Sequence, residues 1–189
     1  MSVIGDLRAL AKAGKDCVTA NSRALTAAEI TEAKTVFLDT INYKQVVIAD
    51  ALGYGGRPFT LVNGDMYTLF MGPSVFAAMG ASDWHDFIHE MTHVWQGQNH
   101  LISSGYMLNS VVSQAIDGQS AYDYKVGDFW GEYNVEQQAH LVEDWYMLEG
   151  KSVAGSRYPY IKNDIRNPLR GWASDLFIGI AAGAAAVKG

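Results

Sequence analysis

The stretch "FIHEMTHVWQGQ", residues 87 to 98, decides the fold and the chemistry expected of this chain. It places His89, Glu90 and His93 in the order H-E-x-x-H. Residues four apart on a helix lie one above the other, so both histidines project from one face and can bind one ion. Glu90 is rotated away from that pair but stays beside it. The pattern predicts a helix with two zinc ligands and a general base.

An ordinary helix is the alternative interpretation of this stretch. A short motif of this kind can arise from composition alone. On that view the two histidines are hydrogen-bonded within the fold, and "THVW", residues 92 to 95, is core packing. A second group of candidate ligands elsewhere in the chain therefore has to decide between the two interpretations.

The helix around the motif has recognisable ends. Ser82 or Asp83 can cap its start, and Gly97 is its expected end. His85 lies one turn before His89, but a fourth protein ligand would close the site against the water that hydrolysis needs. We therefore expect His85 to be exposed or to face a substrate.

A second helix, from Asn134 as its cap to about Leu148, carries the other candidate ligands. Its sequence, "NVEQQAHLVEDWYML", has apolar residues on one side at helical spacing. Glu136 and His140 lie one turn apart on it, so one can be a ligand and the other a partner of a ligand. Cys17 is the single cysteine. The third ligand must therefore be a histidine or a carboxylate.

Strand patterns precede the motif. Residues 43–50, "YKQVVIAD", form a β-branched run. Residues 59–70 contain two strand-like segments, one before and one after Asn63-Gly64. This arrangement predicts a β-hairpin with a two-residue turn at Asn63-Gly64. The sequence thus predicts three strands, partly antiparallel, and an α+β fold with a small, mostly antiparallel sheet.

The length of 189 residues fits one domain. Residues 1–25 are expected to be a lead-in or linker, and residues 26–189 the domain. Thr26 and Glu29 form a capping-box pattern at the start of a helix predicted over about 27 to 40.

The charge composition argues against one class of partner, nucleic acid. With 20 acidic and 14 basic residues the formal net charge is -6. No dense basic run appears, so nucleic acid is not an expected partner.

The two ends of the sequence are checked for export and membrane signals. The N-terminus lacks the apolar core of a secretory signal. The apolar residues 176–187 are too short for a transmembrane span and are expected to form a helix packed on the domain. A short membrane-inserting tail is the alternative.

The two helical motifs together resemble a known family. "FIHEMTHVWQ", followed about forty residues later by "YNVEQQAHLVEDWY", is similar to the zinc metallopeptidase domains attached to VgrG spike proteins, and found in related effectors, of bacterial type VI secretion. The stretches "LTAAEITEAKTVFLDTINYKQVVI" and "VNGDMYTLF" resemble that family's entry helix and strands, so the resemblance covers about residues 25 to 146. It implies a zincin-like fold and a peptidase-type active site.

The resemblance also implies roles for single residues. His89 and His93 match the zinc histidines, and Glu90 matches the catalytic glutamate. Glu136 matches the third zinc ligand. His140 stands where the family often has an acidic residue, which is a departure from the pattern. It is an alternative third ligand, or it donates to Glu136 or to a substrate oxyanion.

The remaining candidates have supporting roles. Asp144 is placed to accept the free N–H of a zinc histidine and so fix its tautomer; an exposed carboxylate is the alternative. Tyr122, Tyr124 and Tyr133 precede the second helix, where a phenol can stabilise a tetrahedral oxyanion. Packing aromatics are the alternative for all three.

The expected activity is hydrolysis of a peptide bond by a zinc-bound water that Glu90 activates. The resemblance implies an antibacterial or host-directed type VI secretion toxin, with the VgrG spike and an immunity protein as partners. Delivery through the secretion needle needs no signal peptide, and the expected place of action is the target-cell periplasm. One alternative is a zinc amidase that acts on peptidoglycan peptides. The other is a non-catalytic, zinc-stabilised docking module.

Overall fold

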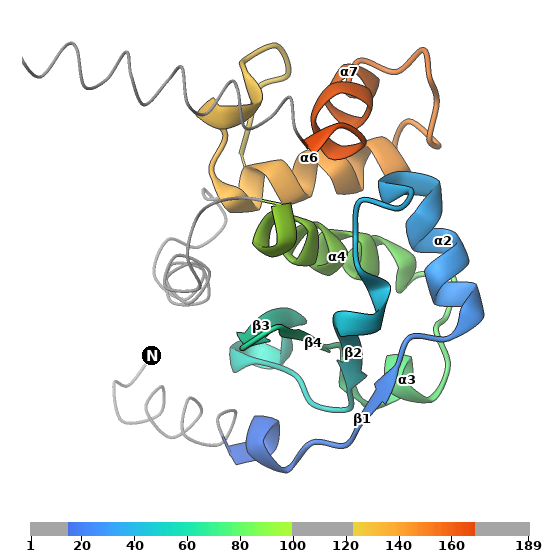
Figure 1. Cartoon of the computed structure of the whole chain (residues 1–189), viewed down its shortest axis with the longest axis vertical. Coiled ribbons are helices and arrows are strands. Elements are labelled where there is room, and N and C mark those ends of the chain that lie inside the picture. The colour runs from blue at the N-terminus through green and yellow to red at the C-terminus, as the bar shows by residue number, and fades with distance from the viewer. Residues whose placement is uncertain (1–14, 100–122, 169–189) are drawn as a thin grey trace, which may run out of the picture.

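The computed structural model describes residues 15–99 and 123–168, which form a small sheet and several helices (Figure 1). The main elements are β1 (Ser22–Ala24), α2 (Ala27–Phe37), β2 (Val46–Ala49), β3 (Phe59–Asn63), β4 (Met66–Phe70), α3 (Gly72–Ala77), α4 (Trp84–Asn99), α6 (Val135–Met147) and α7 (Tyr158–Tyr160). Single turns of other types complete them, at Tyr43–Gln45, Tyr54–Gly56, Trp130–Glu132 and Ile161–Ile165. The predicted α+β class is confirmed. Tyr122 and the apolar segment 176–187 lie outside the described residues.

Four strands form one mixed sheet in the order β1-β2-β4-β3. β1 with β2 and β3 with β4 are antiparallel, whereas the central pair of β2 and β4 is parallel. The sequence predicts only three strands, because Ser22–Ala24 is too short to show an alternating pattern. This strand lies within the segment 1–25 expected as a lead-in. The division of the chain at residue 25 stays a prediction.

The hairpin between β3 and β4 is present, but its turn lies one residue later than predicted. Asn63 pairs with Met66, so the turn residues are Gly64 and Asp65. Gly64 has a φ of 60°, whereas Asp65 is not among the residues with positive φ. A type II′ turn needs glycine at its first central position only. The turn is therefore built around Gly64 and leaves Asn63 in the strand.

Helix α2 begins as predicted and ends at Phe37 instead of about residue 40. The backbone N–H of Glu29 donates to the Thr26 hydroxyl at 3.2 Å, and the Thr26 N–H donates to the Glu29 carboxylate at 2.7 Å. Arg23 in β1 donates to both oxygens of Glu29, at 2.9 and 2.8 Å, and to the Phe76 carbonyl in α3 at 2.9 Å. Arg23 thus joins β1 to α2 by an ion pair and to α3 by a hydrogen bond.

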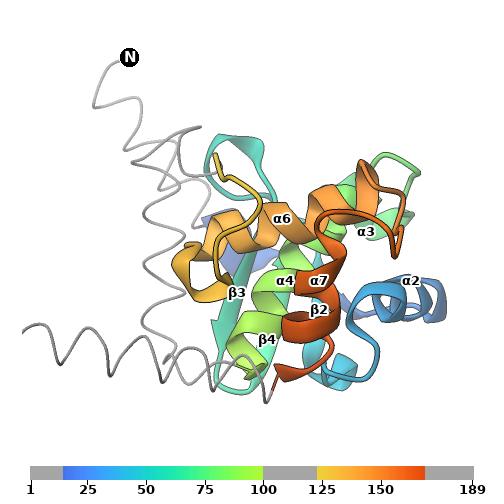
Figure 2. The same cartoon turned by 90° about the horizontal axis from the view of Figure 1, so that it is seen from above.

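Helix α4 lies between the sheet and α6 (Figures 1 and 2). All residues from 87 to 96 are buried, as is typical of a helix with neighbours on several sides. The predicted end at Gly97 is wrong, since the helix continues to Asn99. The Asn99 amide donates to the Thr40 carbonyl at 2.9 Å, which attaches the last turn to the loop after α2.

Helix α6 begins at the predicted cap. The Asn134 side chain accepts from the Gln137 N–H at 2.9 Å, and the Gln137 side chain accepts from the Asn134 N–H at 3.0 Å. The first turn of α6 is thereby held in one place. The buried face of α6 packs on α4, and Trp145 of α6 and Trp95 of α4 are among the largest fully buried side chains.

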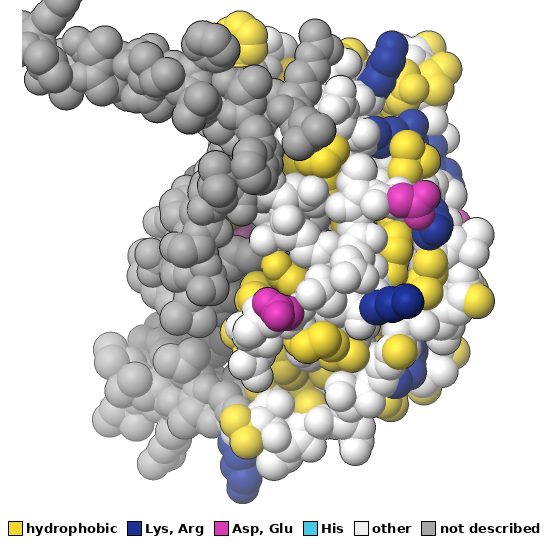
Figure 3. All heavy atoms as spheres, in the orientation of Figure 1, with side chains coloured by type: hydrophobic (Ala, Val, Ile, Leu, Met, Phe, Trp, Pro, Cys, Tyr) yellow, Lys and Arg dark blue, Asp and Glu magenta, His cyan; other side chains and the backbone are white. Residues whose placement is uncertain are grey.

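The surface of the described residues is mixed in character. On the face shown in Figure 3, Lys and Arg side chains are scattered among hydrophobic and uncharged ones and form no continuous basic stripe. Within residues 15–99 and 123–168, the longest apolar helical segments fall short of what a membrane crossing requires.

Candidate metal centre

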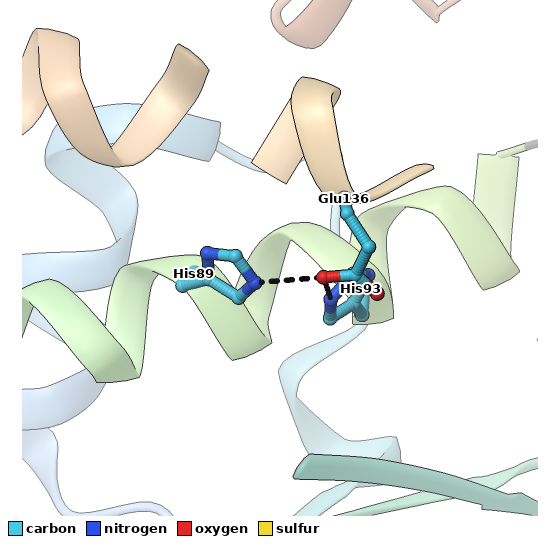
Figure 4. A group of neighbouring side chains, drawn as sticks. All are labelled: His89, His93 and Glu136. Carbon is cyan, nitrogen blue, oxygen red and sulfur yellow. Dashed lines mark hydrogen bonds and ion pairs between the residues drawn. The ribbon is translucent and has the colours of Figure 1, made fainter. Parts of the chain in front are cut away.

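Helix α4 brings His89 and His93 to one side, with their ring centroids 5.0 Å apart. Both are buried, at 8% and 5% exposure. Glu136 comes from the first turn of α6 and points its carboxylate between the two rings (Figure 4). Its Oε2 lies 3.3 Å from His89 Nε2 and 3.6 Å from His93 Nε2. Three potential ligand atoms from two helices therefore converge.

These separations fit a zinc ion. Ligand atoms at about 2.0–2.1 Å from a tetrahedral ion stand about 3.3 Å from one another. The observed values of 3.3 and 3.6 Å require only small adjustments. Two imidazole nitrogens with one carboxylate oxygen are also a donor set that zinc accepts, and a fourth position stays open.

Hydrogen bonds on the other ring nitrogens assign the tautomers. His93 Nδ1 lies 2.8 Å from Gln96 Oε1, and the Gln96 amide nitrogen donates to Val135 O and Gln138 Oε1, so Oε1 is free to accept. His89 Nδ1 lies 3.0 Å from a Glu143 oxygen. With both Nδ1 atoms bound to these oxygens, the Nε2 atoms of both rings face the Glu136 carboxylate, ready to bind an ion or, when protonated, to donate to it.

A nitrogen lone pair that faces a carboxylate is repelled by it unless a proton or a metal ion lies between the two atoms. Among the described residues, the buried atoms His93 Nε2 and Glu136 Oε1 have no hydrogen-bond partner. Burial lowers the pKa of His89, but the nearby carboxylates outweigh this and raise it to about 10. Burial raises the pKa of Glu136, but the opposing effect of His93 and His89 is larger, so the net pKa lies well below the usual range of a glutamate. The group thus favours positive charge at its centre.

Glu90 lies beside the ligand group and not within it. It is 4% exposed, and the Thr60 hydroxyl of β3 donates to its Oε2 at 2.7 Å. Burial raises the pKa of the Glu90 carboxyl, while His93 and His89 oppose the rise. The sequence carries no signal for Thr60, because its role depends on β3 lying next to α4.

Glu143 takes the role that the sequence assigns to Asp144. Glu143 Oε2 accepts from His89 Nδ1 at 3.0 Å, whereas Asp144 Oδ2 accepts from Tyr124 and from Arg157. The prediction that Asp144 accepts the N–H of a candidate zinc histidine is therefore wrong by one position, because the acceptor is Glu143. Glu143 is seven residues after Glu136, so helical spacing alone places the two carboxylates on the same face of α6.

His140 does not reach the group formed by His89, His93 and Glu136. Its Nδ1 lies 3.2 Å from Glu143 Oε2. A second possible ligand group within the described residues consists of His89, His140 and Glu143. His85, expected to be exposed or to face a substrate, is 37% exposed in its side chain and lies 3.3 Å from Glu143 Oε1.

Tyr124 is not placed to stabilise an oxyanion. Its hydroxyl donates to Asp144 at 2.5 Å and accepts from Arg157 Nε at 2.5 Å, so its proton is already used. Tyr133 likewise donates to the Lys125 carbonyl at 2.7 Å. Both phenols hold the loop before α6 in place, and the oxyanion role expected for Tyr124 is not supported.

Comparisons with known proteins relate the chain to type VI secretion. No family model matches the chain. Over 154 residues it is 33% identical to the type VI secretion system spike protein VgrG2b of Pseudomonas aeruginosa PAO1. The match covers 72% of this chain and 14% of VgrG2b, so the chain spans about a seventh of that relative's length.

The fold is also similar to a solved structure. The effector domain of P. aeruginosa VgrG2b matches with a TM-score of 0.53 and 26% identity, covering 84% of this chain and 96% of that domain. The chain resembles a type VI secretion effector domain. The similarity to VgrG2b thus supports the expected relation to VgrG-associated effectors.

Proposed function

We propose that this chain is a zinc metallopeptidase and a toxin delivered by type VI secretion. The observation that carries the proposal is the convergence of His89 Nε2, His93 Nε2 and Glu136 Oε2, at 3.3 and 3.6 Å, next to a buried carboxylate that is not one of them. A purely structural metal site needs no such additional carboxylate. The proposed fold is zincin-like, with α4 as the active-site helix.

His89, His93 and Glu136 are the residues that would hold the ion. When bound, zinc supplies a Lewis acid that polarises the scissile carbonyl and makes water more acidic. Gln96 and Glu143 accept hydrogen bonds from the two Nδ1 atoms and thereby orient the rings. Such partners raise the affinity of histidines for metal.

Glu90 is the proposed general base. It takes a proton from the attacking water and passes it to the leaving amine. Its burial raises the pKa of its carboxyl, which makes it a better base near neutral pH than an exposed glutamate. Thr60 holds one carboxylate oxygen through its hydroxyl, at 2.7 Å. The other oxygen is thereby left to receive the proton.

The similarity to the VgrG2b effector domain supports delivery with a VgrG spike. On this proposal the partners are the spike, a peptide or protein substrate and an immunity protein, and the place of action is the target-cell periplasm. Toxicity after export to the periplasm, compared with toxicity in the cytoplasm, tests the location.

The decisive experiment replaces Glu90 by Gln. The amide has nearly the same size but cannot take up the water's proton, so peptide hydrolysis should fall by about 10²–10⁴-fold while zinc content stays unchanged. Asp65→Asn, in the exposed turn after β3, is the matched control and should retain activity. Full activity or toxicity in a zinc-loaded Glu90→Gln protein would sink the hydrolase proposal in favour of a docking module.

A further inference from the structure

A series of buried amide groups joins His93 to the turn before α6. His93 Nδ1 lies 2.8 Å from Gln96 Oε1, and Gln96 Nε2 donates to Gln138 Oε1 at 2.9 Å. Gln138 Nε2 in turn donates to the carbonyls of Trp130 and Tyr133, at 3.1 and 3.2 Å. The side chains of His93, Gln96 and Gln138 all belong to buried residues. Gln138 therefore lies two hydrogen bonds away from a candidate metal ligand.

The orientation of the Gln138 amide follows from groups that can only accept. The two ends of a glutamine amide have nearly the same shape, so the neighbours decide which end points where. Backbone carbonyls accept hydrogen bonds and never donate them. The end of Gln138 that meets the carbonyls of Trp130 and Tyr133 must therefore be its NH2 group. Its Oε1 atom is left to face Gln96.

The Gln96 amide is fixed in the same way. Its Nε2 donates to the carbonyl of Val135 at 3.0 Å as well as to Gln138 Oε1. A flipped Gln96 amide would place its own oxygen against both of these acceptors, which is costly for buried polar groups. Gln96 Oε1 consequently faces His93, and His93 Nδ1 is the donor in that contact.

This orientation decides which nitrogen of His93 is available to an ion. With a proton on Nδ1, a neutral ring has its lone pair on Nε2, the atom that lies 3.6 Å from Glu136 Oε2. A flipped Gln96 would donate to Nδ1 and leave the ring proton on Nε2, where the ion should bind. His89 has no such ambiguity, because both oxygens of an ionised Glu143 can only accept.

We infer that Gln138 is a positioning residue of the candidate metal centre and that it acts on His93 through Gln96. The inference deepens the proposed function, since it rests on the proposed zinc site, but it does not depend on hydrolysis. Partners of ligating histidines typically change metal affinity by about 10–100-fold. Gln138 acts one step further away, and the Val135 carbonyl still holds Gln96 without it. Loss of the Gln138 amide should therefore lower zinc affinity by about 10-fold, the lower end of that range.

A purely structural role for Gln138 is the alternative. Its NH2 group satisfies two carbonyls before α6, and that task makes no use of Oε1. On this alternative, a Gln138 variant is less stable but binds zinc as tightly as the unaltered chain once it is folded. A measurement of zinc affinity in the folded chain thus separates the two roles.

The test is a double-mutant cycle of zinc affinity with Gln96→Met, Gln138→Met and the double variant, measured by competition with a chelator of known affinity. Methionine has nearly the length of glutamine and lacks its strong donor and acceptor. Gln138→Met should lower the affinity of the otherwise unaltered chain by about 10-fold. It should have little further effect when residue 96 is already methionine, because the path to His93 is then broken.

Gln137→Met is the matched control for this cycle. Gln137 is the neighbour of Gln138 on α6, and its amide donates to the carbonyl of Asp123 at 2.7 Å. Its loss should therefore lower the melting temperature of the metal-free chain and leave the zinc affinity unchanged. Melting of each metal-free variant shows that the affinities are compared between folded chains.

A further measurement does not depend on any variant folding. In the unaltered, zinc-loaded chain, the side-chain amide protons of Gln96 and Gln138 should exchange slowly with water in ¹⁵N NMR, since both amides are buried and hydrogen-bonded. Rapid exchange of the Gln138 amide protons would overturn the inference.

Two results of the cycle would also overturn the inference. The first is an unchanged zinc affinity in Gln138→Met. The second is an equal loss of affinity with and without Gln96, which would show that Gln138 does not act through it. A chain that follows the expected cycle but hydrolyses no peptide would contradict the proposed hydrolysis alone. An unaltered chain that binds no zinc would contradict the proposed metal site, and the inference with it.

Discussion

At the scale of single residues, the candidate for the third metal ligand is the side chain that lies close to the Nε2 atoms of both histidines. Glu136 Oε2 is within 3.6 Å of Nε2 of both His89 and His93. His140, one turn later, contacts Glu143 and Asp144 instead. Glu136 comes first on α6 and reaches deepest, with a side chain 4% exposed against 36% for His140.

We predict that Glu136→Ala loses the tightly bound zinc, because two histidines alone leave a tetrahedral ion with too few protein ligands. His140→Ala should keep it. The measurement is zinc per chain by elemental analysis after dialysis into metal-free buffer, which removes weakly bound zinc. If His140→Ala loses zinc and Glu136→Ala keeps it, His140 is the third ligand.

At the scale of elements, the site is the contact between two helices. His85, His89 and His93 follow one another at intervals of four along α4, and Glu136, His140 and Glu143 lie along one face of α6. Glu136 contacts His89 and His93, whereas Glu143 contacts His85 and His89. The two helices are therefore antiparallel, and side chains on one face of each form the candidate ligand groups.

A prediction at this scale concerns Arg23, which pairs β1 with Glu29 of α2 and donates to a carbonyl of α3. Arg23→Gln should lower the free energy of unfolding by about 3 kcal/mol near pH 7, since it leaves a buried carboxylate uncompensated. Glu29 is 3% exposed in its side chain. Lys34→Gln removes an exposed pair with Asp39 and serves as the control, with an expected change below about 1 kcal/mol.

The same variant has an expected pH dependence. Burial raises the pKa of Glu29, but Arg23 and Thr26 lower it more. A carboxyl group with a lowered pKa in the folded state stabilises the fold above its unfolded pKa of about 4.3 and loses that contribution as pH falls. The loss in free energy of unfolding caused by Arg23→Gln should thus become smaller as the pH falls. Urea unfolding of both proteins at pH 7 and pH 4 measures this loss. An equal loss at the two pH values would contradict the prediction.

At the scale of the whole molecule, the site needs three layers. The sheet supplies Thr60 to Glu90, α4 supplies the histidines, and α6 supplies Glu136 and Glu143. An ion at the buried group would therefore add a link between α4 and α6, which already pack on each other. Metal binding and stability of the fold are expected to be coupled.

Removal of the metal should consequently destabilise the chain. With free zinc about 1,000-fold above its dissociation constant, bound zinc contributes about 4 kcal/mol, and a chelator should abolish that contribution. The melting temperature with EDTA and with restored zinc measures the effect. Glu136→Ala is the control and should melt at the same temperature with and without EDTA. No shift in the unaltered chain would exclude tight zinc binding.

The sequence by itself determined the α+β class, the caps of α2 and α6 and the elements that carry His89, His93 and Glu136. These follow from helical spacing and from hydrogen bonds between residues three apart, which act within one segment. Only the tertiary structure decided what depends on neighbouring elements: the parallel pair of β2 and β4, the contact of Thr60 with Glu90, and Glu143 instead of Asp144 at His89. A rotation of α6 by one residue, about 100°, changes which side chain faces α4, and its packing on α4 sets that angle.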